Sequence, residues 1–413
     1  MTERFGWDRL RPWPVYMLAA AVPLSVAAVS VSKALMFLFG LVALGVGLAH
    51  RERLPQLRAF RTPLMIVAML AALAMSLAYT TAPIDLALSD LGKYGKLLEI
   101  PLVLLLVRTR REALTALAVY GVAQVFVVFS SYLLTLDLVL PWVPKDAAHR
   151  LSIGTVFSSY LDQSIMTAGL AALCWNLRDE LPWRQGRLLA IGIAVVAAIN
   201  VLFLLPGRTG QAGLLAALAL ALFWYLPRRA RPAAIVAPLL LVVAAMAVST
   251  PFRERLTAVV SESQAYRPGD LQLTSSGIRL NLWQRSVEMI REHPLAGSGV
   301  GSWNAEYRRL EGERISPHLV VVRNPHQEYL LWGAQLGLGG IALLLAFFAV
   351  LARDASPFRR DVRHATQSMV AILAVVCFFN ASIFDALIGD YFCVLIGVLL
   401  VLGAHTPPEG KPA

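Results

Sequence analysis

The sequence predicts an all-α integral membrane protein with about twelve transmembrane helices, and three observations support this prediction. Hydrophobic residues make up 57% of the 413-residue chain and charged residues only 15%. The mean hydropathy is +0.63. Apolar residues come in blocks of roughly 15 to 25, which is the helix length that crosses a hydrocarbon core of about 30 Å. Such a composition leaves little room for a large soluble domain.

The candidate spans follow one another along most of the chain, and the first is expected to be an uncleaved span rather than a signal peptide. The three cysteines lie inside apolar runs without a metal-type spacing, so no disulfide framework is expected. We divide the chain into transmembrane helices 1–9 (residues 1–250), a loop region on the outer side of the membrane (251–325), transmembrane helices 10–12 (326–405) and a cytoplasmic tail (406–413). The apolar runs cover 13–31, 34–49, 63–79, 97–107, 113–139, 155–177, 188–205, 211–226, 233–250, 329–351, 366–383 and 388–403.

Lysine and arginine set the expected orientation. With the N-terminus inside, each inside connection carries at least three cations, whereas the short outside connections carry few, such as Lys33, or Lys93 with Lys96. The positive-inside rule therefore places both termini in the cytoplasm. This asymmetry, rather than a nucleic-acid partner, explains the formal net charge of +11.

The connection at residues 251–325 is a long outside loop, which translocates largely regardless of its charge. Within it, the stretch SSGIRLNLWQRSVEMIREHPLAGSGVGSW predicts a helix that begins at Ser275 or Ser276 and stops before Pro294. We expect this helix to lie near the outer membrane surface. Arg279 and Arg285 on it are either solvated or in contact with anionic lipid, or else they bind a ligand. Trp283 fits an interface anchor or a platform for a sugar ring.

Two further outside positions are candidates for chemistry. Arg208, in LLPGRTGQAG, lies in a short turn, and the next span points its N-terminus at it. Free N–H groups and the helix dipole add positive potential there, which favours an anion, although an arginine that snorkels to the lipid headgroups fits the same pattern. Asp162, near the outer end of the sixth span, is either functional or a packing partner for an arginine. Asp385 and Asp390 flank the last outer turn and are expected to be solvated.

The stretch NPHQEYLLWGAQ begins the tenth span with a histidine. Asn324 is expected to cap the helix, Pro325 to take its first position and Gln327 to complete a capping box, which puts His326 in the first turn. The positive end of the helix dipole disfavours imidazolium, so His326 should stay neutral and able to take a proton from a hydroxyl. Alternatively, His326 only bonds its neighbours.

Together these residues suggest one reaction type. Two guanidiniums and two helix N-termini on one face suit a diphosphate, and a base beside them suits the activation of a hydroxyl. An anion site of this kind with a base beside it is suited to the displacement of a lipid diphosphate from an anomeric carbon. The outer side carries no Asp-x-Asp motif and no histidine cluster with metal spacing. We therefore expect arginine to replace a metal, with no cofactor.

At these residues the sequence resembles the O-antigen ligase family and its O-antigen polymerase relatives. The resemblance rests on GRTG before a span, then GIRLNLWQRSVEMIREHPLAGSGVGSW, then NPHQEYLLWGAQLGLGG, and it extends to the whole topology. It implies a fold similar to the C-type membrane glycosyltransferases. It also implies Arg208 and Arg279 as ligands of the diphosphate and His326 as the base. The family more often has Ser where this chain has Gly207.

The resemblance further implies a bacterial inner-membrane enzyme with a periplasmic active site. Its donor would be O-antigen on undecaprenyl diphosphate, and its acceptor a sugar hydroxyl of lipid A-core lipopolysaccharide, with inversion at the anomeric carbon. Membrane lipids are the only other partners expected. An O-antigen polymerase or a protein O-oligosaccharyltransferase that uses the same donor remains an alternative. A transporter is disfavoured because mid-span charges are scarce. Supporting roles are expected for Asn324, Gln327, Trp283, Asp162 and Arg285.

Overall fold

In the residues that it describes, the computed structural model contains helices joined by turns and no strands, which confirms the all-α prediction. These residues are 2–49, 55–143, 154–181, 183–248, 253, 257, 261, 264, 275–312 and 322–407. The predicted loop before residue 275, its segment 313–321 and the tail from residue 408 lie largely or wholly outside them.

Six helices in the described part of the chain are long and apolar enough to cross a membrane. The count of about twelve spans is therefore not confirmed, although the shorter apolar stretches Thr62–Ala78 and Ala233–Val243 add to the membrane character. The six lie in α3 (Val26–Ala49), α8 (Arg110–Thr135), α11 (Gly186–Ile199) with η4 (Asn200–Leu204), α17 (Glu328–Asp354), α18 (Arg360–Phe379) and α19 (Ala386–Ala404).

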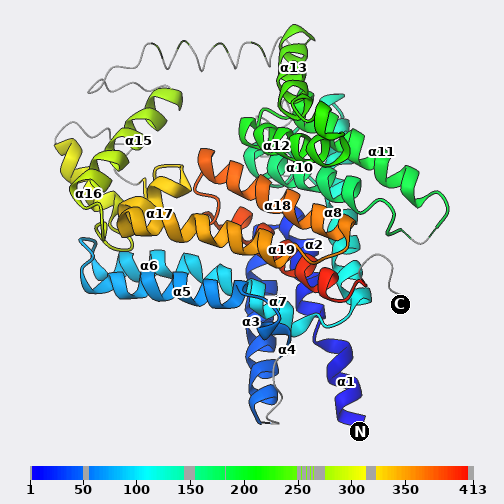
Figure 1. Ribbon diagram of the computed structural model, residues 1–413, viewed down its shortest axis with the longest axis horizontal. Coiled ribbons are helices and arrows are strands. Elements are labelled where there is room, and N and C mark those ends of the chain that lie inside the picture. The colour runs from blue at the N-terminus through cyan, green and yellow to red at the C-terminus, as the bar shows by residue number, and fades with distance from the viewer. Residues whose placement is uncertain are drawn as a thin grey trace.

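The long helix α17 runs through the middle of the molecule (Figure 1). Helices α5 and α6 lie along one side of it, and α18, α10 and α12 lie on the other, while α15 and α16 sit at the end where α17 begins. Helix α19 lies at the centre of the core, because 94% of an 18-residue apolar stretch of this helix is buried. The other helices are α1 (Thr2–Leu10), α2 (Trp13–Leu24), α4 (Pro55–Arg58), α5 (Thr62–Met75), η1 (Ser76–Ala78), α6 (Ile84–Tyr94), η2 (Gly95–Leu98), α7 (Glu99–Leu106), α10 (Tyr160–Asn176), α12 (Arg208–Tyr225), η5 (Arg228–Ala230), α13 (Ala233–Val248), α15 (Ser275–Glu292) and α16 (Trp303–Glu311).

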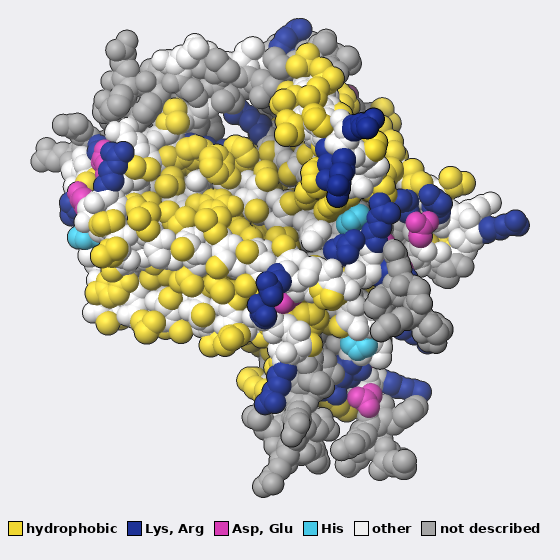
Figure 2. All heavy atoms as spheres, viewed as in Figure 1, with side chains coloured by type: hydrophobic (Ala, Val, Ile, Leu, Met, Phe, Trp, Pro, Cys, Tyr) yellow, Lys and Arg dark blue, Asp and Glu magenta, His cyan; other side chains and the backbone are white. Residues whose placement is uncertain are grey.

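Hydrophobic side chains form a broad belt over α5, α6 and α17, and Lys and Arg gather toward its two ends (Figure 2). Leu64 and Val67 on α5 and Leu338 and Leu345 on α17 are exposed hydrophobic side chains. In water such a patch would favour association, whereas it suits contact with lipid tails. The chain is therefore a multi-pass membrane protein.

The first helices correct one expectation. Helix α2 ends at Leu24 and α3 begins at Val26, so the break falls at Ser25 rather than near residue 32. Lys33 thus lies inside α3 and not in an outside loop. Its Nζ is 2.8 Å from Asp390 Oδ1 and 3.6 Å from Glu99 Oε1. Asp390 is 1% exposed and not solvated as expected. Its pairing with Lys33 compensates the charge, because a charge in an apolar environment needs a partner.

Helices α10 and α12 approach closely because glycine faces Ser164 at two positions. A Cβ on Gly207 would overlap the Ser164 hydroxyl and lie 3.0 Å from the Tyr160 carbonyl oxygen. A Cβ on Gly210 would lie 2.5 Å from the Ser164 carbonyl carbon. This packing gives a reason for glycine at position 207, since Ser164 and the Tyr160 carbonyl already fill the space that a side chain would need.

We expect Gly210→Ala to lower the free energy of unfolding by about 2 kcal/mol, because the added methyl group forces two backbones apart. A thermal melt in detergent, followed by tryptophan fluorescence, measures the change. Gly192→Ala is the matched control, since a Cβ there meets nothing within 4 Å. Equal Tm values for the two variants would contradict this account of the α10–α12 contact.

Candidate active site

His326 lies just before α17 and not in its first turn, which corrects the predicted cap. Gln327 is the N-cap, and its side chain accepts a hydrogen bond from Leu330 N at 2.6 Å. Asn324 Oδ1 instead accepts from His326 N at 2.9 Å. This local bond holds His326 at a φ of 51°, a left-handed conformation that a residue with a side chain rarely adopts and that cannot start a helix. Such strain is frequent at functional sites.

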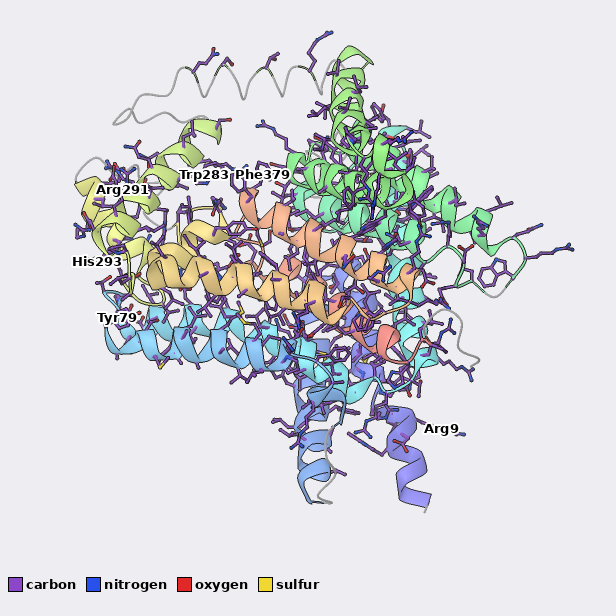
Figure 3. All side chains as sticks on the ribbon, viewed as in Figure 1. Arg9, Tyr79, Trp283, Arg291, His293 and Phe379 are labelled. Carbon is purple, nitrogen blue, oxygen red and sulfur yellow. The ribbon has the colours of Figure 1, made fainter. Side chains whose placement is uncertain are left out.

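Trp283 connects the loop helix α15 to the His326 segment. Its Nε1 donates a hydrogen bond to the Pro325 carbonyl oxygen at 3.1 Å. Its ring packs edge-on against Phe378, with 5.8 Å between centroids. Figure 3 shows Trp283 next to the end of α18, while Arg291 lies further along α15. Trp283 therefore connects α15 to the segment that carries His326. This contact was not part of either role expected from the sequence, an interface anchor or a platform for a sugar ring.

Arg279 lies one turn before Trp283 on the same face of α15, and Arg208 is near enough for its charge to act on Arg279. Burial lowers its pKa, Tyr160 at the start of α10 opposes this, and the nearby charge of Arg208 lowers the pKa further. Arg208 is the exposed first residue of α12 rather than part of a turn. The starts of α10 and α12 thus lie near the start of α15.

The same guanidinium also acts on His326. Burial lowers the pKa of the imidazole, Asp385 raises it, Arg279 lowers it and a hydrogen bond with Asn380 raises it, with a net decrease. Arg279 therefore lies within electrostatic range of both Arg208 and His326. Arg208 and His326 are 118 positions apart in the sequence, yet both interact electrostatically with Arg279.

The sequence did not single out Asn380, which contacts the imidazole directly. His326 Nδ1 is 3.4 Å from Asn380 Oδ1, and Asn380 Nδ2 donates to Asp385 Oδ2 at 2.7 Å. Asn380 follows α18 and is 5% exposed. A polar side chain at the end of an apolar run is the signal that would have found it. Asp385, which was expected to be solvated, is half-buried.

Two supporting residues lie in other contacts. Arg285 bonds Glu311 and Glu288, each at 2.7 Å, and so stabilises the α15–α16 unit. Ser159 caps α10, because its Oγ accepts from Asp162 N and donates to Asp162 Oδ2 at 2.8 Å, so Asp162 belongs to the first turn of this helix. Asp162 has no arginine partner among the ion pairs of the described residues. No group of three His, Cys, Asp or Glu side chains in these residues is placed to hold a metal ion.

A comparison with protein families is consistent with this geometry. The model of the O-antigen ligase family matches residues 192–345, which include Arg208, Arg279 and His326. No curated protein matches the chain. In a multi-pass membrane protein, this match supports a function of the ligase or polymerase type in general. The match supports the assignment of this chain to the O-antigen ligase family, as its motifs predicted.

The lowered pKa predicts how His326 reacts with diethyl pyrocarbonate. This reagent acylates a histidine side chain in its neutral form and not in its protonated form. Because its folded-state pKa is below 6.5, His326 stays neutral as the pH falls through 6.5. We expect its rate of acylation, followed by peptide mass spectrometry, to reach half its maximum below pH 6.5.

Arg279→Gln should move this midpoint to higher pH, because it removes a positive charge that opposes protonation. Arg291→Gln, on the same helix but toward its far end, is the control and should leave it unchanged. A wild-type midpoint at or above pH 6.5, or equal midpoints in the two variants, would contradict the assigned electrostatics.

Proposed function

We propose that this protein is an O-antigen ligase of the bacterial inner membrane. It transfers O-antigen polysaccharide from undecaprenyl diphosphate to a sugar hydroxyl of lipid A-core lipopolysaccharide. The family match supports ligase or polymerase function in general. The observation that carries the specific proposal is the position of Arg279, within electrostatic range of both Arg208 and His326.

The two arginines suit the donor diphosphate. Arg208 is the first residue of α12, where Gly207 provides no side-chain cap, so free backbone N–H groups lie at the residue that carries the guanidinium. Arg279 is partly buried, and electrostatic attraction is stronger where water is excluded. Two like charges repel each other in the free protein, and a dianionic group between them relieves that repulsion.

His326 suits the role of general base. Its lowered pKa keeps the imidazole neutral at pH 7, so Nε2 can accept the proton of the acceptor hydroxyl. The hydroxyl oxygen forms a bond to the anomeric carbon as the bond from that carbon to the phosphate oxygen breaks. Undecaprenyl diphosphate leaves with its negative charge between Arg208 and Arg279. A single displacement inverts the configuration of the anomeric carbon, and the arginines take the place of a metal.

The remaining charges support a periplasmic site with both termini in the cytoplasm. At the opposite end of α10 from Tyr160, Glu180 pairs with Arg110 and Arg359, which belong to different predicted inside connections. The cation-rich connections thus meet at one end of the helices, and the proposed site lies at the other. The positive-inside rule assigns the cation-rich end to the cytoplasm.

Complementation of a ligase-deficient strain tests the proposal, with lipopolysaccharide analysed by gel electrophoresis. His326→Ala should abolish long-chain lipopolysaccharide, because loss of a general base typically costs about 10²–10⁴ in rate. Arg291→Gln is the control and should restore it. Full restoration by His326→Ala, in membranes that contain equal amounts of both proteins, would contradict the assigned mechanism.

Steady-state kinetics of the purified protein distinguish the role of the two arginines from that of the base. With Arg208→Gln or Arg279→Gln, we expect the KM for the lipid-linked donor to rise roughly tenfold or more, in addition to a lower kcat, because each charge-assisted contact with a phosphate is worth about 1.5–3 kcal/mol. Unchanged kinetics in both variants would exclude them as ligands of the diphosphate.

The deletion phenotype distinguishes related activities that use the same donor. A ligase deletion leaves lipid A-core bare and polymer on the carrier. Single repeat units on lipid A-core would indicate an O-antigen polymerase instead, and unmodified pilin-like proteins would indicate a protein O-oligosaccharyltransferase.

A further inference from the structure

We propose that Asn380 is the positioning residue that orients the His326 imidazole with Nε2 toward the acceptor hydroxyl, and that Asp385 fixes the amide of Asn380. This inference rests on the proposed function, because it assigns the partner of the proposed base. It names a residue from the turn between α18 and α19, which lies outside the matched family segment at residues 192–345.

The direction of each hydrogen bond follows from what each group can donate. A carboxylate only accepts, so the amide nitrogen of Asn380 is the atom that faces Asp385 Oδ2, at 2.7 Å. The amide oxygen then faces His326 Nδ1, at 3.4 Å. An amide oxygen also only accepts, so Nδ1 carries the hydrogen. The lone pair is therefore on Nε2, which is the atom that takes the proton.

The turn that carries Asn380 and Asp385 is held from two sides. Glu328 Oε2 accepts from Ile383 N at 2.9 Å and from Phe384 N at 3.2 Å. On the other side, Lys96 Nζ donates to the Phe384 carbonyl oxygen at 3.2 Å and to that of Asp385 at 2.5 Å. Glu328 and Lys96 are both buried. A side chain on a turn held in this way loses little entropy when it fixes an imidazole, which suits an orienting role.

The charges around the pair are of both signs. Arg279 on α15 and Asp385 face His326. Lys96 on η2 and Lys93 on α6 face Asp385, together with His326. Asp162 on α10 also faces Asp385. The electrostatic potential at His326 therefore depends on the position of the Asp385 carboxylate. Moving this negative charge closer to the imidazole, or removing it, changes the pH at which His326 is protonated.

The test uses full-length protein in nanodiscs, with undecaprenyl diphosphate-linked O-antigen as donor and lipopolysaccharide lacking O-antigen as acceptor. The readouts are kcat, the KM for donor, and the pH of the acidic limb of kcat/KM. Asn380→Ala should lower kcat roughly 10- to 100-fold with little change in KM, because the base spends less time in the productive orientation.

A swap variant removes the ambiguity of a folding defect. Asn380→Asp combined with Asp385→Asn keeps both hydrogen bonds but places the carboxylate beside Nδ1. We expect kcat at least tenfold above that of Asn380→Ala, and an acidic limb shifted upward by about one pH unit or more. Asp385→Asn alone removes a charge that favours imidazolium and should shift the limb downward. A residue with only a structural role would not move the limb in opposite directions.

Asn176→Ala is the matched control, because Asn176 is also buried and hydrogen-bonded, to Ser368 and the Ala172 carbonyl oxygen, at the other end of α10. It should leave the pH profile unchanged. Wild-type kcat in Asn380→Ala, or a swap variant with a wild-type acidic limb, would overturn the inference. If His326→Ala is inactive while these variants behave as wild type, only the inference fails. If His326→Ala transfers polymer normally, the proposed function itself fails.

Discussion

The carboxylate of Glu328 is the contact on which the arrangement of the site depends. It is fully buried and accepts hydrogen bonds from Ile383 N, Phe384 N and Trp332 Nε1. In an apolar environment each unpaired N–H would cost several kcal/mol, so these bonds fix the α18–α19 turn against the start of α17. His326 precedes Glu328 by two residues, and Asn380 begins the turn. The contact between them follows from this connection.

A separate contact positions Arg279 near His326. Trp283 binds the Pro325 carbonyl oxygen and so holds α15 against the His326 segment, with Arg279 one turn away. Arg208 arrives on α12, which packs closely on α10 at Ser164 because Gly207 and Gly210 have no side chain. The short segment before α17 is therefore bound to the loop helix α15 through Trp283, and Arg279 of α15 lies within electrostatic range of Arg208 at the start of α12.

Patterns within one helix were predictable, and contacts between distant helices were not. Hydropathy gave the membrane character, and the periodicity of α15 gave its extent. Local rules failed at His326, where Asn324 had been expected to cap a helix but closes a turn that keeps the histidine outside it. They also failed at Lys33, whose partner Asp390 lies 357 residues away, because no local pattern reveals such a partner. Asn380 was missed for the same reason.

A density map of the protein in a nanodisc with undecaprenyl diphosphate would show directly where the diphosphate binds. We expect the diphosphate between the guanidiniums of Arg208 and Arg279, with His326 Nδ1 on Asn380 and Nε2 open toward the face where the sugar would lie. A diphosphate bound away from both arginines, or an imidazole turned away from it, would contradict the account.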